Sequence, residues 1–71
     1  MTFYRWLHQQ ISRNDRIGDL ARDAFADSQL KRFGYITLRR HMIACRACDE
    51  AMEAAKAAHA EYLQQRAGAS A

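Results

Sequence analysis

The sequence predicts an all-α protein, built as one small bundle of four main helices plus a short helical turn. Three observations lead to this prediction. The chain of 71 residues contains no proline, the residue that most often breaks a helix. Alanine, the strongest helix former, is abundant. Apolar residues recur at intervals of three and four, which is the period of a helix with one buried face.

The first helix is expected over residues 2–12. Thr2 is a suitable N-cap, because its hydroxyl can accept a hydrogen bond from a free N–H group of the first turn. The apolar residues that follow repeat with helical spacing, so one side of this helix should face the core. The residues expected there are Trp6, Leu7 and, in part, Phe3 or Tyr4.

The second helix has the best-specified start in the chain and should run to about Asp27. Asn14 and Asp15 are both good N-cap residues. Gly18 lowers the stability of a helix, so its presence needs a reason. We expect the first helix to pack closely against its bare backbone. The apolar stripe of this second helix comprises Ile17, Leu20, Ala21, Ala24 and Phe25.

The region after Asp27 is less regular in its pattern. A short helical turn is expected at 29–33, followed by a loop at Gly34. A strand is not expected, because no other segment of the chain could pair with it. Thr37 is a suitable N-cap for a third helix over residues 38–45.

The last helix is expected over residues 48–66 and is the longest. Cys48 stands where a serine cap would be expected. We therefore predict a single helical domain over residues 1–66 and a frayed C-terminal tail over residues 67–71. The predicted core comprises Trp6, Leu7, Ile17, Leu20, Phe25, Phe33, Leu38, Met42, Met52, Ala55, Tyr62 and Leu63.

Composition limits the functional classes to be considered. The formal charge of +3 is only mildly basic and is by itself weak evidence for nucleic-acid binding. The sequence has no signal-peptide pattern and no apolar run of about 18 residues, the length of a membrane span. We therefore expect a cytoplasmic protein without a membrane partner and with reduced cysteines.

One short motif deserves a chemical interpretation. Cys45 and Cys48 form a C-x-x-C pair, and His41 lies one helical turn before Cys45. This pattern is compatible with a redox pair or half of a zinc site, but a structural zinc site needs four ligands. Neither His59 nor Asp49 stands at a recognisable spacing for the fourth. We favour the simpler interpretation, in which Cys45 is a small core residue and Cys48 caps the next helix in place of a serine. We predict no catalytic residue, no metal and no cofactor.

Charge is segregated along the chain. No acidic residue occurs between Asp27 and Asp49, whereas four acidic residues precede this interval at every fourth position. Such charges are often only a solvated surface, but here they predict two faces of opposite sign. The acidic face comprises Asp15, Asp19, Asp23 and Asp27. The basic face comprises Lys31, Arg32, Arg39, Arg40 and Arg46.

Three sets of residues stand out together: Phe3-Tyr4-x-Trp6-Leu7, Asp15-x-Ile17-Gly18-Asp19-Leu20-Ala21-x-Asp23, and Ala47-Cys48-Asp49-Glu50-Ala51 with a later Tyr62. Together they resemble the YozE-like family of small bacterial proteins with a SAM-like helical fold. The resemblance covers most of residues 3–63 and implies a compact domain of four or five helices. It implies no catalytic residue.

We predict a non-enzymatic protein-interaction module, because no constellation of catalytic residues or small-molecule site stands out. SAM-like domains commonly associate head to tail, so the resemblance implies that the acidic face of helix two meets the basic face at 31–46 of a second copy. The alternative is nucleic-acid binding through the same basic segment, where arginine side chains would contact phosphates.

Overall fold

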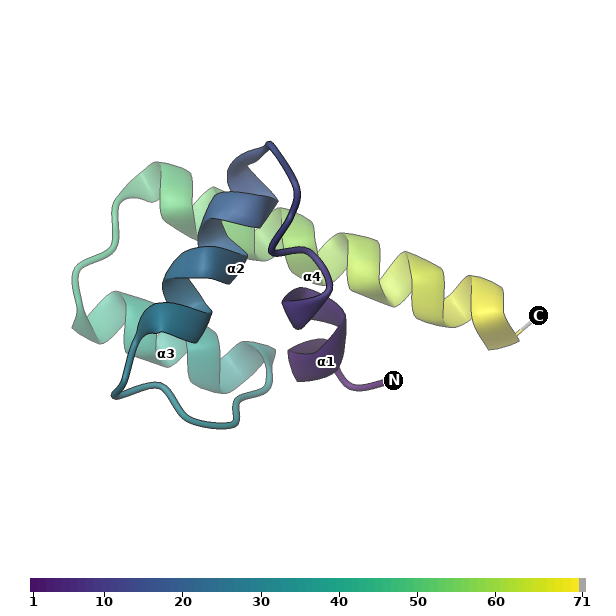
Figure 1. Cartoon of the computed structure of the whole chain (residues 1–71), viewed down its shortest axis with the longest axis horizontal. Coiled ribbons are helices and arrows are strands. Elements are labelled where there is room, and N and C mark those ends of the chain that lie inside the picture. The colour runs from purple at the N-terminus through teal and green to yellow at the C-terminus, as the bar shows by residue number, and fades with distance from the viewer. Residues whose placement is uncertain (71) are drawn as a thin grey trace.

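The protein consists of four α-helices (Figure 1), and the computed structural model describes residues 1–70, with side chains described through residue 68. The described residues contain no strand, so the predicted all-α class and the four main helices are confirmed. No described helix has the length and apolar character needed to cross a membrane. In chain order the helices are α1 (Phe3–His8), α2 (Arg16–Ala26), α3 (Tyr35–Ala44) and α4 (Asp49–Ser70).

Helix α4 is the element against which the other three helices pack. Its 22 residues correspond to a rod of about 33 Å, and Figure 1 shows its C-terminal part projecting beyond the rest of the bundle. Two hydrogen bonds tie the N-terminus to this helix. The indole N–H of Trp6 donates to the side-chain oxygen of Gln65 at 2.7 Å, and the hydroxyl of Tyr62 donates to the carbonyl of Met1 at 2.8 Å.

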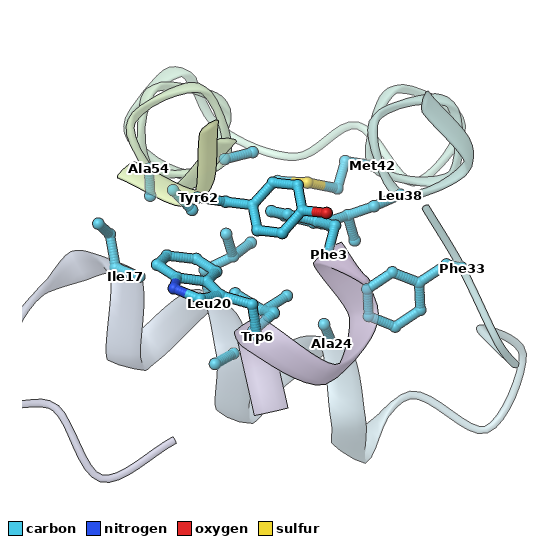
Figure 2. Close-up of a cluster of buried hydrophobic side chains, with 14 residues drawn as sticks. Phe3, Trp6, Ile17, Leu20, Ala24, Phe33, Leu38, Met42, Ala54 and Tyr62 are labelled. Atoms are coloured by element: carbon cyan, nitrogen blue, oxygen red, sulfur yellow. The ribbon is translucent and has the colours of Figure 1, made fainter. Parts of the chain in front are cut away.

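A single cluster of buried side chains joins the four helices (Figure 2). Most of the predicted core is buried, but Phe25 and Met52 are only partly buried. Leu63 was predicted wrongly, because 46% of its surface is exposed beside the projecting part of α4. The buried positions of α4 are occupied mainly by the small residues Ala54, Ala55 and Ala58. The buried set is Phe3, Trp6, Leu7, Ile17, Leu20, Ala21, Ala24, Phe33, Leu38, Met42, Ala54, Ala55, Ala58 and Tyr62.

The two N-caps predicted for the first half of the chain are correct. The hydroxyl of Thr2 accepts from the N–H of Arg5, and the carboxylate of Asp15 accepts from the N–H of Gly18. Helix α1 is shorter than predicted, since it ends at His8 and residues 9–12 continue as hydrogen-bonded turns.

The connection between α2 and α3 differs from the prediction. A single turn closed by the N–H of Leu30 and the carbonyl of Asp27 replaces the helical turn expected at 29–33. Helix α3 begins at Tyr35 with Gly34 as its N-cap, so Thr37 lies inside the helix. The apolar pattern alone did not locate this start, because no side chain caps it.

Helix α4 begins as predicted and ends later than predicted. The carbonyl of Cys48 accepts from the N–H of Met52, which places Cys48 in the N-cap position. The helix continues through Ser70, four residues beyond the predicted end at 66. Fraying of the tail at 67–71 stays a prediction, and Ala71 lies outside the described residues.

Gly18 is buried at the start of α2, but the neighbour that requires a glycine is not α1. A Cβ atom at this position would lie 2.0 Å from the carbonyl oxygen of Arg13, in the turn that precedes the helix. This distance is far below any van der Waals contact. The glycine therefore allows the chain to fold back tightly before α2, and the prediction of a helix–helix contact here is wrong.

Candidate functional site

A groove of about 350 Å³ lies between α2, α3 and the first turns of α4. Its floor is apolar and its rim is polar, which is the usual composition of a binding site. The four carboxylates on the rim come from Asp19, Asp23, Asp27 and Glu50. The floor is formed by Leu20, Ala24, Leu38, Met42, Ala51 and Ala54.

The helical period explains why acidic side chains line this groove. Asp19, Asp23 and Asp27 are spaced by four residues, so they lie one above another along α2. Leu20 directly follows Asp19, Ala24 directly follows Asp23, and both belong to the buried stripe of α2. The acidic row therefore borders the apolar face of the helix. Three of the four residues predicted as an acidic face are thus brought together.

Asp15, the fourth member of the predicted acidic face, does not line the groove. Its carboxylate caps α2 through Gly18 and lies 2.6 Å from the guanidinium of Arg13. Hydrogen bonds from Arg13 and from Gly18 lower the pKa of Asp15. Arg13 also binds Glu61 at 2.9 Å, which links the turn before α2 to α4, and these carboxylates raise the pKa of Arg13. Asp15 therefore has a structural role.

The remaining acidic residues differ in their partners. Asp19 pairs with Arg22, which also donates to the carbonyls of Ile11 and Arg13. Within the described part of the chain, Asp23 and Glu50 have neither an ion-pair nor a hydrogen-bond partner among the side chains. Both are exposed on the groove rim. They are therefore the carboxylates that a partner can reach without displacing an internal cation.

Asp27 connects the end of α2 to α3. Its carboxylate lies 2.7 Å from Nε2 of His41 and accepts from the N–H of Gln29 at 2.9 Å. These two interactions lower the pKa of Asp27. The sulfur of Cys45 approaches the same Nε2 atom of His41, at 3.6 Å. Asp27, His41 and Cys45 thus meet at a single ring nitrogen on the groove wall.

The C-x-x-C motif lies at the same end of the groove. Cys45 and Cys48 are free, exposed thiols that both line it, so the prediction of a buried Cys45 is wrong. Among the described residues, no three His, Cys, Asp or Glu side chains are arranged to hold a metal ion. His59 does not line the groove, and its ring stacks on Tyr35 with centroids 4.0 Å apart.

The predicted basic residues are all exposed, but they occupy different segments. Lys31 and Arg32 lie in the connection between α2 and α3, Arg39 and Arg40 lie on α3, and Arg46 follows α3. In the portion with described side chains, none of the five pairs with a carboxylate. These residues therefore keep their full charge available at the surface.

Two exposed isoleucines accompany the arginines of α3, and the sequence analysis missed them. Ile36 and Ile43 are 59% and 56% exposed. They are seven residues apart, so two helical turns place them on the same side. Arg40 lies between them on that side, opposite the buried Leu38 and Met42. The signal was present in the sequence, because the two isoleucines fall outside the buried stripe of the helix.

Arg46 has a left-handed backbone, with φ of 58°. The N–H of Ala47 donates to the carbonyl of Met42, and the N–H of Arg46 donates to the carbonyl of Ile43. These two bonds form a Schellman motif, in which glycine is the usual residue at the left-handed position. The motif ends α3 and directs the chain into α4, so that both cysteines line the groove.

Of the three comparisons with known proteins, one found a match. The comparison with curated proteins found no match, and neither did the comparison with solved structures. A family model described as the YozE SAM-like fold matches residues 2–64, which covers all four helices except the projecting end of α4. The all-α bundle and the motifs noted in the sequence agree with this match. The chain therefore belongs to the YozE SAM-like family.

Proposed function

We propose that this protein is a non-enzymatic protein-interaction module whose binding site is the groove between α2, α3 and α4. One observation carries the proposal: the groove combines an apolar floor with a rim that holds four carboxylates and a single arginine, Arg16. Such a surface is complementary to a protein segment that presents apolar side chains next to basic ones. Burial of the apolar side chains provides affinity, and the opposite charges provide specificity and a faster association.

The unpaired carboxylates on the rim support this proposal. Asp23 lines the groove from α2 and Glu50 lines it from α4, and both side chains are exposed. An arginine or lysine of a partner can approach them without breaking an existing ion pair. Asp19 and Asp27 add negative potential while remaining held by Arg22 and His41. The groove therefore carries two free and two internally paired carboxylates against one arginine, Arg16, and this excess of negative charge favours a basic partner.

The arrangement at His41 argues against a hydrolytic or thiol-dependent enzyme. A catalytic histidine takes the proton of the nucleophile on one ring nitrogen while a carboxylate orients the ring through the other. Here Asp27 and Cys45 both approach Nε2. A proton at Nε2 that is donated to Asp27 leaves no acceptor for the thiol proton. This geometry favours a structural role for the Asp27–His41 pair.

Nucleic-acid binding through residues 31–46 is the second proposal, and the five unpaired basic side chains favour it. It predicts contacts to phosphates by Lys31, Arg32 and the arginines of α3, with a steep loss of affinity as salt increases. The modest net charge of +3 and the acidic groove beside α3 weigh against it. The two proposals place the binding site on different residues, so one experiment separates them.

The test is a titration of ¹⁵N-labelled protein followed by amide chemical shifts. The probes are an amphipathic helical peptide with isoleucine and arginine on one face, the same peptide with glutamate in place of arginine, and a short DNA duplex. We expect shifts around Asp23, Glu50 and Ala51 with the first peptide only. Shifts confined to α3 and residues 31–32, seen only with DNA, would establish the second proposal instead.

Glu50 and Glu53 provide a matched control. They lie three residues apart on α4, and only Glu50 lines the groove. Glu50→Gln should weaken binding of the basic peptide by about twofold to fivefold, the range of an exposed ion pair. Glu53→Gln should leave it unchanged. Equal effects of the two variants, or no binding of the peptide at millimolar concentration, would contradict the interaction proposal.

A further inference from the structure

We propose that the outer face of α3 binds the surface of a membrane that contains anionic lipids. We define this face by four exposed residues, Ile36, Arg39, Arg40 and Ile43. None of the four lines the groove, so the proposal is independent of what the groove binds. The sequence-based expectation of no membrane partner considered only signal peptides and spanning segments, and contact with a lipid surface requires neither.

The outer face of α3 presents an apolar ridge between two arginines. Ile36 and Ile43 are 59% and 56% exposed, and two helical turns place them on one line along the helix. With about 100° of rotation per residue, Arg39 lies about 40° to one side of this line and Arg40 about 40° to the other. An arginine in such a position lays its aliphatic stem along the apolar ridge and keeps its guanidinium in the polar layer above it. This arrangement is typical of a helix that lies in the interface of a bilayer.

The packing of α3 fixes the direction of this face. Leu38 and Met42 are 1% and 8% exposed, and Figure 2 shows both pointing from α3 into the buried cluster. The contact of His41 with Asp27 holds the same helix against the end of α2. The helix therefore cannot rotate to cover its isoleucines, and only a surface outside the bundle can remove them from water.

The charges around α3 favour an anionic surface. The interval between Asp27 and Asp49 contains no acidic residue. Its five arginines and lysines are exposed, and the described side chains include no carboxylate that pairs with any of them. The carboxylates of the groove lie on the other side of α3, next to the buried Leu38 and Met42. The basic side can therefore approach a negative surface, where each basic residue adds to the attraction.

The isoleucines favour a lipid surface over nucleic acid, the other anionic partner. Contacts with a phosphate backbone require only the basic side chains, and they leave Ile36 and Ile43 without an apolar partner. A bilayer offers phosphates in its outer layer and hydrocarbon directly beneath them. Arginines at the edges of an apolar ridge match this order of layers, because the ridge enters deepest and the guanidinium groups stay at the phosphates.

The test is flotation with vesicles of phosphatidylcholine alone and of phosphatidylcholine mixed with phosphatidylglycerol. We expect binding to the mixed vesicles only, with a decrease as salt is added. Ile36→Ser with Ile43→Ser should weaken this binding by about tenfold or more, because two apolar side chains no longer leave water. Arg40→Gln should weaken it by about fivefold, the effect of one basic residue at an anionic surface. Both variants should keep the wild-type circular dichroism, because the three positions are exposed.

Two residues of α4 provide matched controls. Leu63 is 46% exposed, so Leu63→Ser removes an exposed apolar side chain away from α3. Lys56 is exposed, so Lys56→Gln removes one positive charge away from α3. Both variants should bind the mixed vesicles like the wild type, which separates the outer face of α3 from general effects of hydrophobicity and net charge.

Three results would overturn this inference. The first is a wild-type protein that does not bind the mixed vesicles at millimolar lipid. The second is full binding by the isoleucine variant, because charge alone would then hold the protein at the vesicle. If a short DNA duplex also binds and Arg40→Gln weakens that complex, the arginines of α3 belong to the nucleic-acid proposal. The third is equal weakening by Arg40→Gln and Lys56→Gln. The peptide titration of the groove reports on other residues, so its outcome is independent of all three.

Discussion

The acidic helix α2 and the basic segment 31–46 look equivalent in the sequence, but they differ in how the fold uses them. Three of the four aspartates on α2 and at its two ends have a partner inside the molecule. Asp15 pairs with Arg13, Asp19 with Arg22, and Asp27 with His41. None of the five basic side chains of 31–46 pairs with a carboxylate in the portion with described side chains. Asp15, Asp19 and Asp27 therefore make contacts within the fold, whereas the five basic residues remain available.

This difference changes how charge variants should be interpreted. Replacement of Asp15, Asp19 or Asp27 removes an internal partner from Arg13, Arg22 or His41, so a loss of binding in such variants is ambiguous. Arg39 and Arg40 are exposed and have no ion-pair partner among the described residues, so their replacement should report on binding and not on stability. Asp23 is the exception on α2, because it has no internal partner within the described residues, and it is the acidic residue of choice for binding studies.

The largest expected effect concerns the start of the acidic helix. Gly18→Ala should lower the free energy of unfolding by about 1–3 kcal/mol, because the new Cβ would collide with the carbonyl of Arg13. Gly68→Ala is the matched control, since no atom beyond the neighbouring backbone of its own helix lies within 4 Å of its Cβ position, and alanine favours helix. Urea unfolding measures both. A stabilised Gly18→Ala variant would show that the turn before α2 is not closely packed.

The next effect has the opposite sign and lies in the basic segment. Arg46→Gly should raise the free energy of unfolding by about 1 kcal/mol, because glycine adopts the left-handed conformation without a steric penalty. Arg46→Ala keeps the penalty while removing the charge, so its stability should match the wild type within about 0.5 kcal/mol. Thermal melting followed by circular dichroism distinguishes them. Equal melting temperatures for the two variants would contradict the role of the backbone.

A direct comparison of the two regions uses neutral variants of similar shape. Asp19→Asn with Asp27→Asn should lower the melting temperature, because Arg22 and His41 lose their partners. Arg39→Gln with Arg40→Gln should leave the melting temperature unchanged, because neither arginine has an internal partner. Melting curves at low salt provide the measurement. Equal losses in the two double variants would remove the distinction between the regions.

The smallest effect is the dependence of stability on pH. The folded-state pKa values of Asp15 and Asp27 lie below their ordinary value of 3.8. Their contribution is therefore present above that value and is lost as the pH falls through the lowered pKa values. Urea midpoints measured from pH 6 down to pH 2.5 should decrease on the acid side. In Asp15→Asn with Asp27→Asn this decrease should be shallower, and an unchanged slope would exclude these two groups as its cause.

Local features were predictable wherever the chemistry is local. The caps at Thr2 and Asp15 were read correctly, because a side-chain oxygen three residues before a free N–H group acts within a single turn. The start of α3 was predicted too late, since Gly34 offers no such oxygen. The grouping of Asp19, Asp23 and Asp27 was also predictable, because it depends only on the period of α2.

The sequence by itself determined the all-α class, the four helices, most of the buried residues and the segregation of charge, because helical period and capping act over a few residues. Arg13–Asp15 and Arg22–Asp19 are local charge pairs, but only the tertiary structure decided the long-range ones. The Asp27–His41 contact joins residues 14 apart, and the Arg13–Glu61 contact joins residues 48 apart. The groove likewise exists only where α2, α3 and α4 meet. Such contacts depend on how the helices pack, which no local pattern specifies.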